Sequence, residues 1–316
     1  MFLSPLAAIY GAVAARRLSQ PGSDAGIPVV CIGNLTVGGA GKTPTAMAVA
    51  TILADAGETP FVLSRGYGGR LPGPVRVDPA KHGAADVGDE PLLLAQVAPT
   101  IVSRDRAAGA MAARAAGAST IVMDDGFQNP ALKKDLSLLV IDGSRGIGNG
   151  RVFPAGPLRA PLDAQLARAH ALLVIGEGAA AQPVIAAAGN LGVFHGRLKP
   201  DASVLAGLRG VKVMAFAGIG NPDKFFATLL DAGIDVRATR IFPDHHRYRR
   251  AEGAGLVEGA LRDGLVLITT EKDLARLSGT DDLRALAAVA RVLPVQLEVD
   301  EADAFRRFVI TRGAGA

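Results

Sequence analysis

One segment, residues 28–57, constrains the fold of this chain more strongly than any other. An apolar run over Pro28–Ile32 predicts a buried strand, and a long apolar stretch that Gly57 ends predicts a helix. The turn between them, Thr36–Thr43, reads TVGGAGKT and matches the phosphate-loop pattern G-x-x-x-x-G-K-[ST], with Thr36 in place of the first glycine. A strand, a glycine-rich turn and a helix in this order predict an α/β fold of the P-loop NTPase type, with a parallel sheet.

The residue types of this turn suit a phosphate chain. Successive backbone N–H groups at the glycines can surround phosphate oxygens, and the start of the helix adds positive dipole character. Lys42 is placed to reach the β- and γ-phosphates, and the Thr43 hydroxyl to bind Mg²⁺. The predicted nucleotide contacts are Thr36, Val37, Gly38, Gly39, Ala40, Gly41, Lys42 and Thr43. The alternative is an ordinary glycine-rich turn, which the flanking strand and helix disfavour.

A pair of acids follows a second apolar run. The segment STIVMDDGFQN, residues 119–129, ends its apolar part at Asp124 and Asp125. A carboxylate at the end of a strand beside a phosphate loop holds Mg²⁺ or its water shell in nucleotide-binding proteins. Asp-Asp-Gly is also a common turn and alone would carry little weight. Together with the phosphate loop, the pair predicts a magnesium site at Thr43, Asp124 and Asp125.

Apolar runs alternate with helical stretches along most of the chain, which is typical of a parallel sheet with helical crossovers. The predicted strands are Pro28–Ile32, Pro60–Leu63, Thr120–Met123, Leu136–Ile141, Ala171–Ile175, Val211–Ala217, Val236–Thr239, Leu265–Thr269 and Val292–Gln296. The stretch Gly176–Leu205 has no clear periodicity, and we expect a domain boundary near Pro200–Gly207. The expected organisation is an N-terminal helix (1–20), a phosphate-loop domain (21–203) and a second, smaller α/β lobe (204–316).

Composition narrows the class of partner. Lys and Arg total 34 and Asp and Glu 30, so the formal net charge is only +4, and the chain has no Trp and three Tyr. This balance predicts no nucleic-acid partner and is compatible with an anionic substrate or an acidic membrane surface. The single cysteine, Cys31, excludes an internal disulfide and favours a reducing compartment. No apolar run reaches the roughly 18–20 residues that span a bilayer.

Residues 1–18 predict a short amphipathic helix rather than a signal peptide, because the basic residues Arg16 and Arg17 follow the apolar stretch instead of preceding it. Ser4 is expected as the N-cap, with Pro5 in the first helical position. The apolar side chains of this segment are Phe2, Leu3, Leu6, Ile9, Tyr10 and Val13. Such a helix can lie in a membrane interface or pack on the domain core, and its apolar face does not decide between the two.

Short blocks along the chain resemble one family, the tetraacyldisaccharide 4′-kinases, which phosphorylate the lipid A precursor. The blocks are GNLTVGGAGKTP (33–44), SRGYG (64–68), GDEP (88–91), DDGFQ (124–128), GNGRVFPAGPLR (148–159), AGIGNPDKFF (217–226), FPDHHRY (242–248) and TTEKD (269–273). They occur in the family's order and cover nearly the whole chain. The threonine at position 36 is what the family shows there.

The resemblance implies transfer of a phosphoryl group from ATP, with Mg²⁺, to the 4′-hydroxyl of a tetraacylated glucosamine disaccharide 1-phosphate, giving lipid IVA. It also implies a peripheral protein on the cytoplasmic face of the bacterial inner membrane, and no required protein partner is evident. By position, Asp89 would be the general base, assisted by His245, and Lys42 would act in catalysis. Further residues would line the site: Arg65, Tyr67, Glu90, Arg106, Gln128 and Arg159.

Two positions depart from the family pattern. Asn129 stands where the family usually has His, and Ala160 where it usually has Glu. We therefore leave both out of the predicted site.

Without the resemblance, these residues have structural alternatives. Asp89 could cap a helix that has Pro91 in its first turn. His245 and His246 are adjacent, so in an extended loop at most one of them readily enters a site. A histidine that pairs with a carboxylate is the functional interpretation, and a polar loop without a role is the alternative. The arginines of the glycine-rich turns could be ordinary surface charges.

Two other functions use the same phosphate loop. A switch or partition-type ATPase would explain the loop and the acids but not a second lobe with a polar Asp-His-His loop. A soluble small-molecule kinase is the nearer rival, and the N-terminal helix argues mildly against it.

Overall fold

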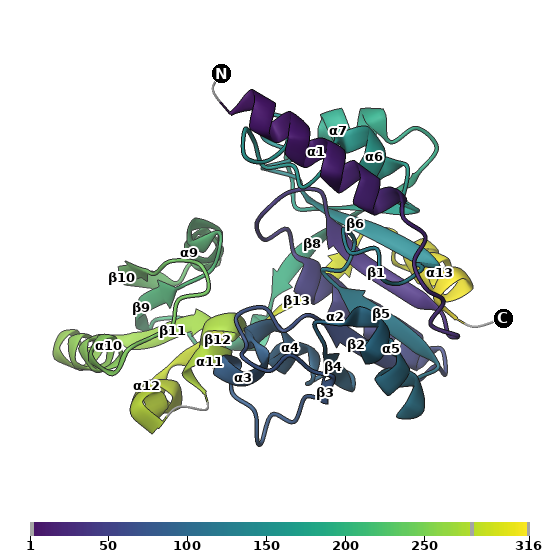
Figure 1. Cartoon of the computed structure of the whole chain (residues 1–316). Helices are drawn as coiled ribbons and strands as arrows, with labels where there is room; N and C mark the ends of the chain where they lie inside the picture. The colour runs from purple at the N-terminus through teal and green to yellow at the C-terminus, as the bar shows by residue number, and fades with distance from the viewer. Residues whose placement is uncertain (1–2, 279–280, 315–316) are drawn as a thin grey trace.

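The structure is a computed structural model that describes residues 3–278 and 281–314. The chain forms two lobes (Figure 1). The strands of the larger lobe are β1 (Val29–Asn34), β2 (Pro60–Ser64), β3 (Val75–Arg76), β4 (Thr100–Val102), β5 (Thr120–Asp124), β6 (Leu136–Asp142), β7 (Ala171–Ile175), β8 (Gly192–Pro200) and β13 (Val295–Val299). They form one nine-stranded sheet in the order β13-β8-β7-β6-β1-β5-β2-β4-β3, in which β1 runs parallel to both neighbours and the edge strands β3 and β13 are antiparallel.

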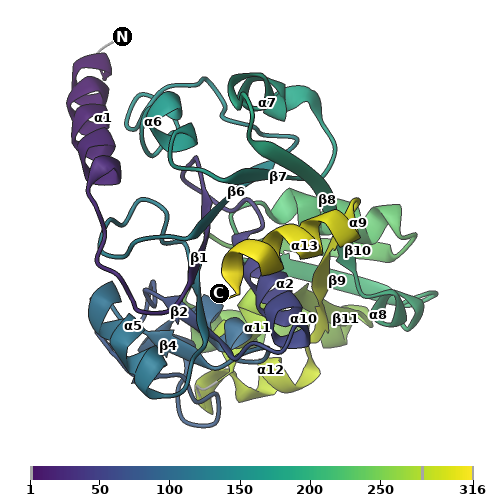
Figure 2. The ribbon, with the colours of Figure 1, turned by 90° about the vertical axis from the view of Figure 1, so that its right-hand side faces the viewer.

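Helices cover both faces of this sheet (Figure 2). The helices of the larger lobe are α1 (Ser4–Ser19), α2 (Lys42–Asp55), α3 (Ala84–Val87), α4 (Asp89–Leu94), α5 (Arg106–Ala115), α6 (Leu162–Leu166), α7 (Gln182–Ala187), the 3₁₀ turn η1 (Ala179–Ala181) and α13 (Ala302–Gly313). Ile32 of β1 packs in one core with Leu53 of α2 and Phe305 of α13, and Cys31 faces the opposite core with Ala113 of α5. Every residue of β1, β5 and β6 is buried, as expected for central parallel strands.

The smaller lobe has its own parallel sheet. Its strands are β9 (Lys212–Ala217), β10 (Asp235–Ile241), β11 (Val266–Thr270) and β12 (Arg291–Leu293), in the order β10-β9-β11-β12. Its helices are α8 (Ala202–Ala206), α9 (Pro222–Asp231), α10 (Arg250–Asp263), α11 (Glu271–Leu277), α12 (Arg284–Val289) and the 3₁₀ turn η2 (Asp281–Leu283). The α/β class with a mainly parallel sheet and a second lobe is therefore as predicted.

Apolar packing joins the lobes at one helix pair. Ala275 of α11 lies in the same buried cluster as Leu92 and Leu93 of α4 and Val87 of α3. This cluster places the N-terminal end of α4 beside the second lobe, which matters for the site below.

The C-terminal part of the chain differs from the predicted organisation. The expected strand Val292–Gln296 is two strands, β12 in the small sheet and β13 in the large one, with Pro294 between them. Proline has no N–H with which to continue a ladder, so it ends one strand where the chain changes sheets. Consequently β13 and α13 belong to the larger lobe, although the expected second lobe (204–316) included them. Sequence reasoning also missed β8, in which every residue but Gly196 is exposed or half-exposed.

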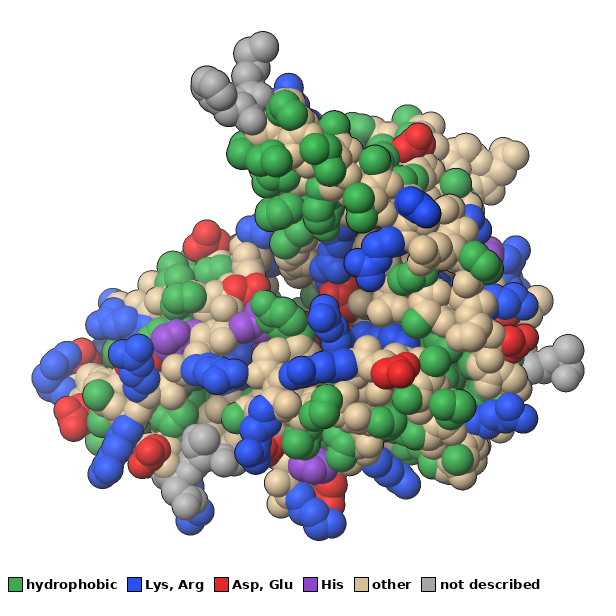
Figure 3. All heavy atoms as spheres, in the orientation of Figure 1, with side chains coloured by type: hydrophobic (Ala, Val, Ile, Leu, Met, Phe, Trp, Pro, Cys, Tyr) green, Lys and Arg blue, Asp and Glu red, His purple; other side chains and the backbone are tan. Residues whose placement is uncertain are grey.

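The N-terminal helix packs through its small residues. The helix begins one residue earlier than expected, with Leu3 at the N-cap position and no side-chain cap, so Ser4 is not the cap. Its buried residues include Ala7 and Gly11. The large apolar side chains point outward, as Figure 3 shows at the top of the molecule: Leu3, Leu6, Ile9, Tyr10 and Val13. Phe2 lies outside the described residues, and among the described helices none is long and apolar enough to cross a membrane.

Candidate active site

The phosphate loop, Thr36–Thr43, connects β1 to α2. Gly41 occupies the N-cap of α2 with a φ of 90°, in the left-handed region that favours glycine. A Cβ atom added at Gly38 or Gly39 would meet no atom of the described residues within 4 Å, so the loop borders open space. The side-chain amide of Asn34 donates hydrogen bonds to two loop carbonyls, at 2.7 and 3.0 Å. The N–H of Val37 donates to the carbonyl of Pro157 at 2.8 Å, whereas the N–H groups of Gly38, Gly39 and Gly41 make no backbone hydrogen bond among the described residues, so these three can approach an anion.

Asp125 forms ion pairs with Lys42 of the loop and with Arg159. Its carboxylate lies 3.7 Å from Nζ of Lys42 and accepts two hydrogen bonds from the Arg159 guanidinium, at 3.0 and 3.2 Å. Arg159 also donates from Nε to the carbonyl of Thr36 at 2.9 Å, which ties the acid to the loop. Burial acts to raise the pKa of Asp125, but Lys42 and Arg159 more than offset it and hold that pKa below its usual range. Burial lowers the pKa of Lys42, and Asp125 opposes this effect.

Asp124 is suited to hold a divalent cation. Its side chain is 2% exposed, and neither carboxylate oxygen has a hydrogen-bond partner among the described residues. Burial raises the pKa of Asp124 to about 7, and the charges of Glu90 and Asp125 add to this effect. A buried carboxylate without a partner needs a counter-charge, and oxygen ligands are those that Mg²⁺ prefers. With the buried Thr43 hydroxyl at the start of α2, these residues fit the predicted magnesium site.

Asp89 and His245 meet across the junction of the lobes. Asp89 is the first residue of α4 and is 4% exposed, and its Oδ2 atom lies 3.4 Å from Nδ1 of His245. The Asp89 carboxylate also accepts a hydrogen bond from the N–H of Glu90 at 3.0 Å. The ring of Tyr67 packs edge-on against the imidazole, with 5.0 Å between ring centroids. His245 has a φ of 55°, a rare left-handed conformation for a non-glycine residue that marks functional sites.

The charges at this junction set two opposite pKa shifts. Burial acts to raise the pKa of Asp89, but the contact with His245 and the nearby Arg276 and Lys272 cations hold that pKa well below its usual range. The same contact with Asp89 raises the pKa of His245, which burial and Arg276 oppose. The pair therefore carries a permanent carboxylate beside an imidazole that takes up a proton more readily than usual.

Sequence reasoning missed the second-lobe cations that surround Asp89. Arg276 donates from Nε to Asp89 Oδ2 at 2.7 Å, and Lys272 lies 2.6 Å from Oε1 of Glu90. Lys272 belongs to the block TTEKD, and Arg276 follows it by one helical turn. That spacing puts both cations on one face of α11, which is the only signal in the sequence that could have found them.

The remaining predicted residues differ in burial. Gln128 donates from Nε2 to the carbonyl of Asn34 at 2.9 Å, and Arg106 is buried, where burial lowers its pKa and Asp124 opposes that effect. Arg65 and Tyr67 are exposed on the turn after β2, and the positive charge of Arg65 helps to lower the pKa of Arg106. Gln128 thus borders the acid pair through Arg159, whereas Tyr67 lies against His245 at the junction of the lobes.

The two departures from the family pattern fall inside the larger lobe. The carbonyl of Asn129 accepts a hydrogen bond from the half-buried Lys134 at 2.7 Å. Ala160 is fully buried, and its carbonyl accepts from the Gln165 amide at 2.8 Å. Neither side chain contributes a charged group to the site.

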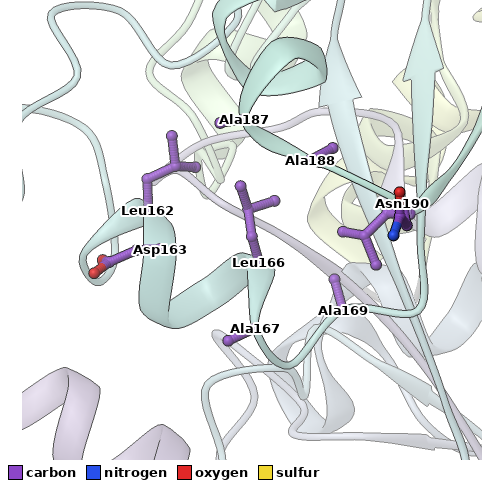
Figure 4. Close-up of a pocket in the computed structure, with 9 residues that line it drawn as sticks. Leu162, Asp163, Leu166, Ala167, Ala169, Ala187, Ala188 and Asn190 are labelled. Atoms are coloured by element: carbon purple, nitrogen blue, oxygen red, sulfur yellow. The ribbon is translucent and has the colours of Figure 1, made fainter.

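The site opens into the hollow between the lobes, where Figure 3 shows basic side chains together with acidic and histidine side chains. A separate hollow of about 800 Å³ lies between α6 and α7 (Figure 4). Leucine and alanine side chains dominate its lining, which carries one charged group, Asp163. It therefore offers little chemistry for phosphoryl transfer.

A phosphate loop beside an aspartate pair, of which Asp124 is buried, facing a second lobe that supplies polar groups, defines a nucleotide-dependent phosphotransferase of the P-loop class. A model of the family described as tetraacyldisaccharide-1-P 4′-kinase matches residues 1–313. The chain belongs to this family.

Individual relatives agree with that assignment. The chain is 59% identical to a tetraacyldisaccharide 4′-kinase of Rhodopseudomonas palustris (strain BisB18), over 98% of this chain and 91% of that protein. It is 60% identical to the protein of the same description from Methylobacterium sp. (strain 4-46), over 96% of this chain and 90% of that one. A crystal structure of LpxK from Aquifex aeolicus in complex with ATP superposes with a TM-score of 0.76 at 26% identity, covering 98% of both chains.

Proposed function

We propose that this protein transfers the γ-phosphoryl group of ATP to the 4′-hydroxyl of a tetraacylated glucosamine disaccharide 1-phosphate, with Asp89, His245 and Lys42 as its catalytic residues. The observation that carries the assignment of residues is the set of charged contacts at the start of α4: Asp89 lies 3.4 Å from His245, and its neighbour Glu90 lies 2.6 Å from Lys272. The negative charge of Glu90, next to Asp89, acts to raise the pKa values of both Lys42 and Asp124. Donor and acceptor chemistry thus share one charged cluster.

On the donor side, the phosphate loop would hold the triphosphate, and Lys42 would place its charge on the transferring group. Phosphoryl transfer passes through a loose transition state, so positioning and charge neutralisation contribute most of the catalysis. Thr43, Asp124 and Asp125 would hold Mg²⁺, which supplies positive charge toward the phosphates when bound. Arg159, hydrogen-bonded to Asp125 and to the loop, would keep this group of residues in register.

On the acceptor side, the Asp89–His245 pair would take the proton of the sugar hydroxyl as transfer proceeds. Asp89 supplies the negative charge that makes the pair basic, and His245, 31% exposed against 4% for Asp89, is its more accessible member. General-base catalysis of this kind contributes roughly 10²–10⁴-fold in rate. Asp89 is not the N-cap of α4, because Gly88 holds that position, and its carboxylate accepts from the N–H of Glu90 while also meeting His245 and Arg276.

We infer that α1 seats the protein on the cytoplasmic face of the inner membrane. The outward side chains Leu6 and Ile9 are 56% and 65% exposed, while the helix packs on the body through small residues. Arg16 and Arg17 lie in its last turn, where they can meet anionic head groups. A contiguous exposed apolar face with adjacent basic residues is typical of interfacial helices. The acyl chains of the substrate require catalysis at such a surface.

One assay tests the proposed activity against its rivals. The protein is incubated with γ-labelled ATP, Mg²⁺ and a detergent-dispersed tetraacyldisaccharide 1-phosphate, and the label is followed into the lipid. We expect a labelled lipid that is absent when the 4′-hydroxyl is blocked. Hydrolysis of ATP without labelled lipid would indicate a switch-type ATPase, and equal labelling of a deacylated disaccharide would indicate a soluble small-molecule kinase.

A further inference from the structure

Arg276 of α11 holds the carboxylate of Asp89 from the opposite lobe. Its Nε atom donates to Asp89 Oδ2 at 2.7 Å, and its Nη2 atom lies 2.5 Å from the same oxygen. The Arg276 side chain is 6% exposed and that of Asp89 is 4% exposed, so solvent screens this ion pair little. A buried guanidinium with two contacts to one carboxylate oxygen restricts where that carboxylate can lie.

Arg276 is itself fixed by buried groups of the second lobe. Its Nη1 atom donates to Asp273 Oδ1 at 2.9 Å and to the carbonyl of Gly218 at 2.5 Å. Asp273 is fully buried and also accepts hydrogen bonds from the N–H of Gly218 at 3.0 Å and the hydroxyl of Tyr248 at 2.9 Å. The guanidinium therefore cannot turn away from Asp89 without breaking a network that the lobe's own core supports.

Asp89 approaches this network from the first lobe, and His245 approaches Asp89 from the second. Oδ2 of Asp89 faces both His245 Nδ1 and Arg276, while the N–H of Glu90 donates to Oδ1. Both ends of the carboxylate are thereby engaged, and its orientation toward the imidazole is set.

We propose that Arg276 is a positioning residue that orients Asp89 toward His245, so that the proton-accepting pair is assembled only where the two lobes meet. This inference rests on the proposed role of the Asp89–His245 pair. Arg276 does not contact the reacting atoms; it acts through Asp89.

The charges around Asp89 predict how the pH dependence of kcat should change when Arg276 is replaced. The groups that face it are His245, Arg276 and Lys272 from the second lobe and Glu90 from its own helix. The positive charge of Arg276 holds down the pKa of Asp89, and it also opposes the increase in the pKa of His245 that the contact with Asp89 causes. Without Arg276 both pKa values rise, so the acidic limb of the kcat profile moves to higher pH.

The test uses Arg276→Met and Arg276→Lys in the full chain, assayed for lipid phosphorylation with ATP and Mg²⁺. Arg145→Met is the matched control, because Arg145 also crosses the junction, donating to the carbonyl of Gly220 at 3.4 Å, without touching Asp89. For Arg276→Met we expect kcat to fall by up to about a hundredfold, with KM for ATP nearly unchanged and the acidic limb shifted upward. Arg276→Lys keeps the charge but not the planar geometry and should restore the pH midpoint more than the rate.

Three outcomes decide the matter. If Arg276→Met matches Arg145→Met in kcat and in pH midpoint while Asp89→Asn is inactive, the inference is overturned and the proposed base stands. If Asp89→Asn itself retains activity, the proposed base falls, and the inference falls with it. Should Arg276→Met fail to fold by thermal melting, the pH midpoint and rate of Arg276→Lys, compared with Arg145→Lys, decide in its place.

Discussion

His245 Nδ1 lies 3.4 Å from Oδ2 of Asp89, although the two residues belong to different lobes. The contact is short enough to couple their protonation, and it exists only because α11 packs on α4 and brings the loop after β10 to the start of that helix. Proton transfer from the acceptor hydroxyl is therefore tied to the relative position of the lobes.

Asp89→Asn should lower kcat by roughly 10²–10⁴-fold, because the amide cannot accept the proton or carry the charge that makes the pair basic. KM for ATP should change little, because the contacts of Asp89 among the described residues are with Glu90, His245 and Arg276 rather than with the phosphate loop. Asp86→Asn is the matched control: Asp86 sits in the first turn of the neighbouring helix α3 and accepts a backbone hydrogen bond from Gly83. A kcat for Asp89→Asn within about threefold of that control, far less than a general base contributes, would contradict the assignment.

Lys42→Met should reduce transfer by at least about 10²–10³-fold, because it removes the charge aimed at the transferring phosphoryl group while keeping the buried stem. Lys42 is 9% exposed, so its replacement should also alter stability through its partner Asp125, and thermal melting with and without ATP separates the two effects. Lys133→Met, a surface lysine, is the control. Normal turnover of Lys42→Met at saturating ATP would disprove the phosphate-loop assignment.

Thr43→Ala should weaken the Mg²⁺ dependence specifically. The Thr43 hydroxyl is buried at the start of α2, and its loss removes an oxygen ligand from the predicted metal site without changing a charge. Titration of activity against Mg²⁺ at fixed ATP should show a higher half-saturating concentration. Thr45→Ala, also a buried threonine of α2 but bonded to the Gly41 carbonyl, serves as the comparison and should keep the wild-type Mg²⁺ curve.

The junction should be more stable at acidic than at alkaline pH. The pKa of His245 is raised by its contact with Asp89, so the stabilisation is fully present below the ordinary histidine pKa of about 6.5 and is lost as pH rises through the raised value. Melting temperatures of the wild type and His245→Asn should therefore differ most below about pH 6.5 and converge as the pH rises through the raised pKa of His245. A difference that stays constant over this range would contradict the coupling.

Replacing Leu6 and Ile9 by Asp should move protein from vesicles containing anionic lipid into the unbound fraction, measured by flotation. The two side chains are the apolar surface that α1 offers to an interface, and ATP binding should be unaffected. Leu261→Asp is the matched control, because Leu261 is 77% exposed on α10 of the other lobe. High salt should release only part of the wild type, since the apolar share of binding is not screened. Loss of ATP binding in the double variant would instead mean that the helix belongs to the core.

Some parts of this architecture could be predicted because their causes are local. Strands such as Leu136–Ile141 are continuous apolar runs that only a covered sheet can bury, and the structure contains them as β6. Strand β8 could not be recognised in the same way, because its exposed and half-exposed residues leave no apolar run. The residues after Pro294 could not be assigned to a sheet from the sequence. They pair with β8, and that pairing depends on how the two lobes are placed relative to each other.

By itself, the sequence determined the phosphate loop and the acid pair at the end of β5, because glycine conformations, a helix N-terminus and the end of a parallel strand are set by neighbouring residues. It also determined the apolar character of the N-terminal helix. Only the tertiary structure decided which side of that helix faces outward, and that Arg276 and Asp89 share a buried contact. Those relationships join segments far apart in the chain, and no local periodicity or spacing records which distant surfaces pack together.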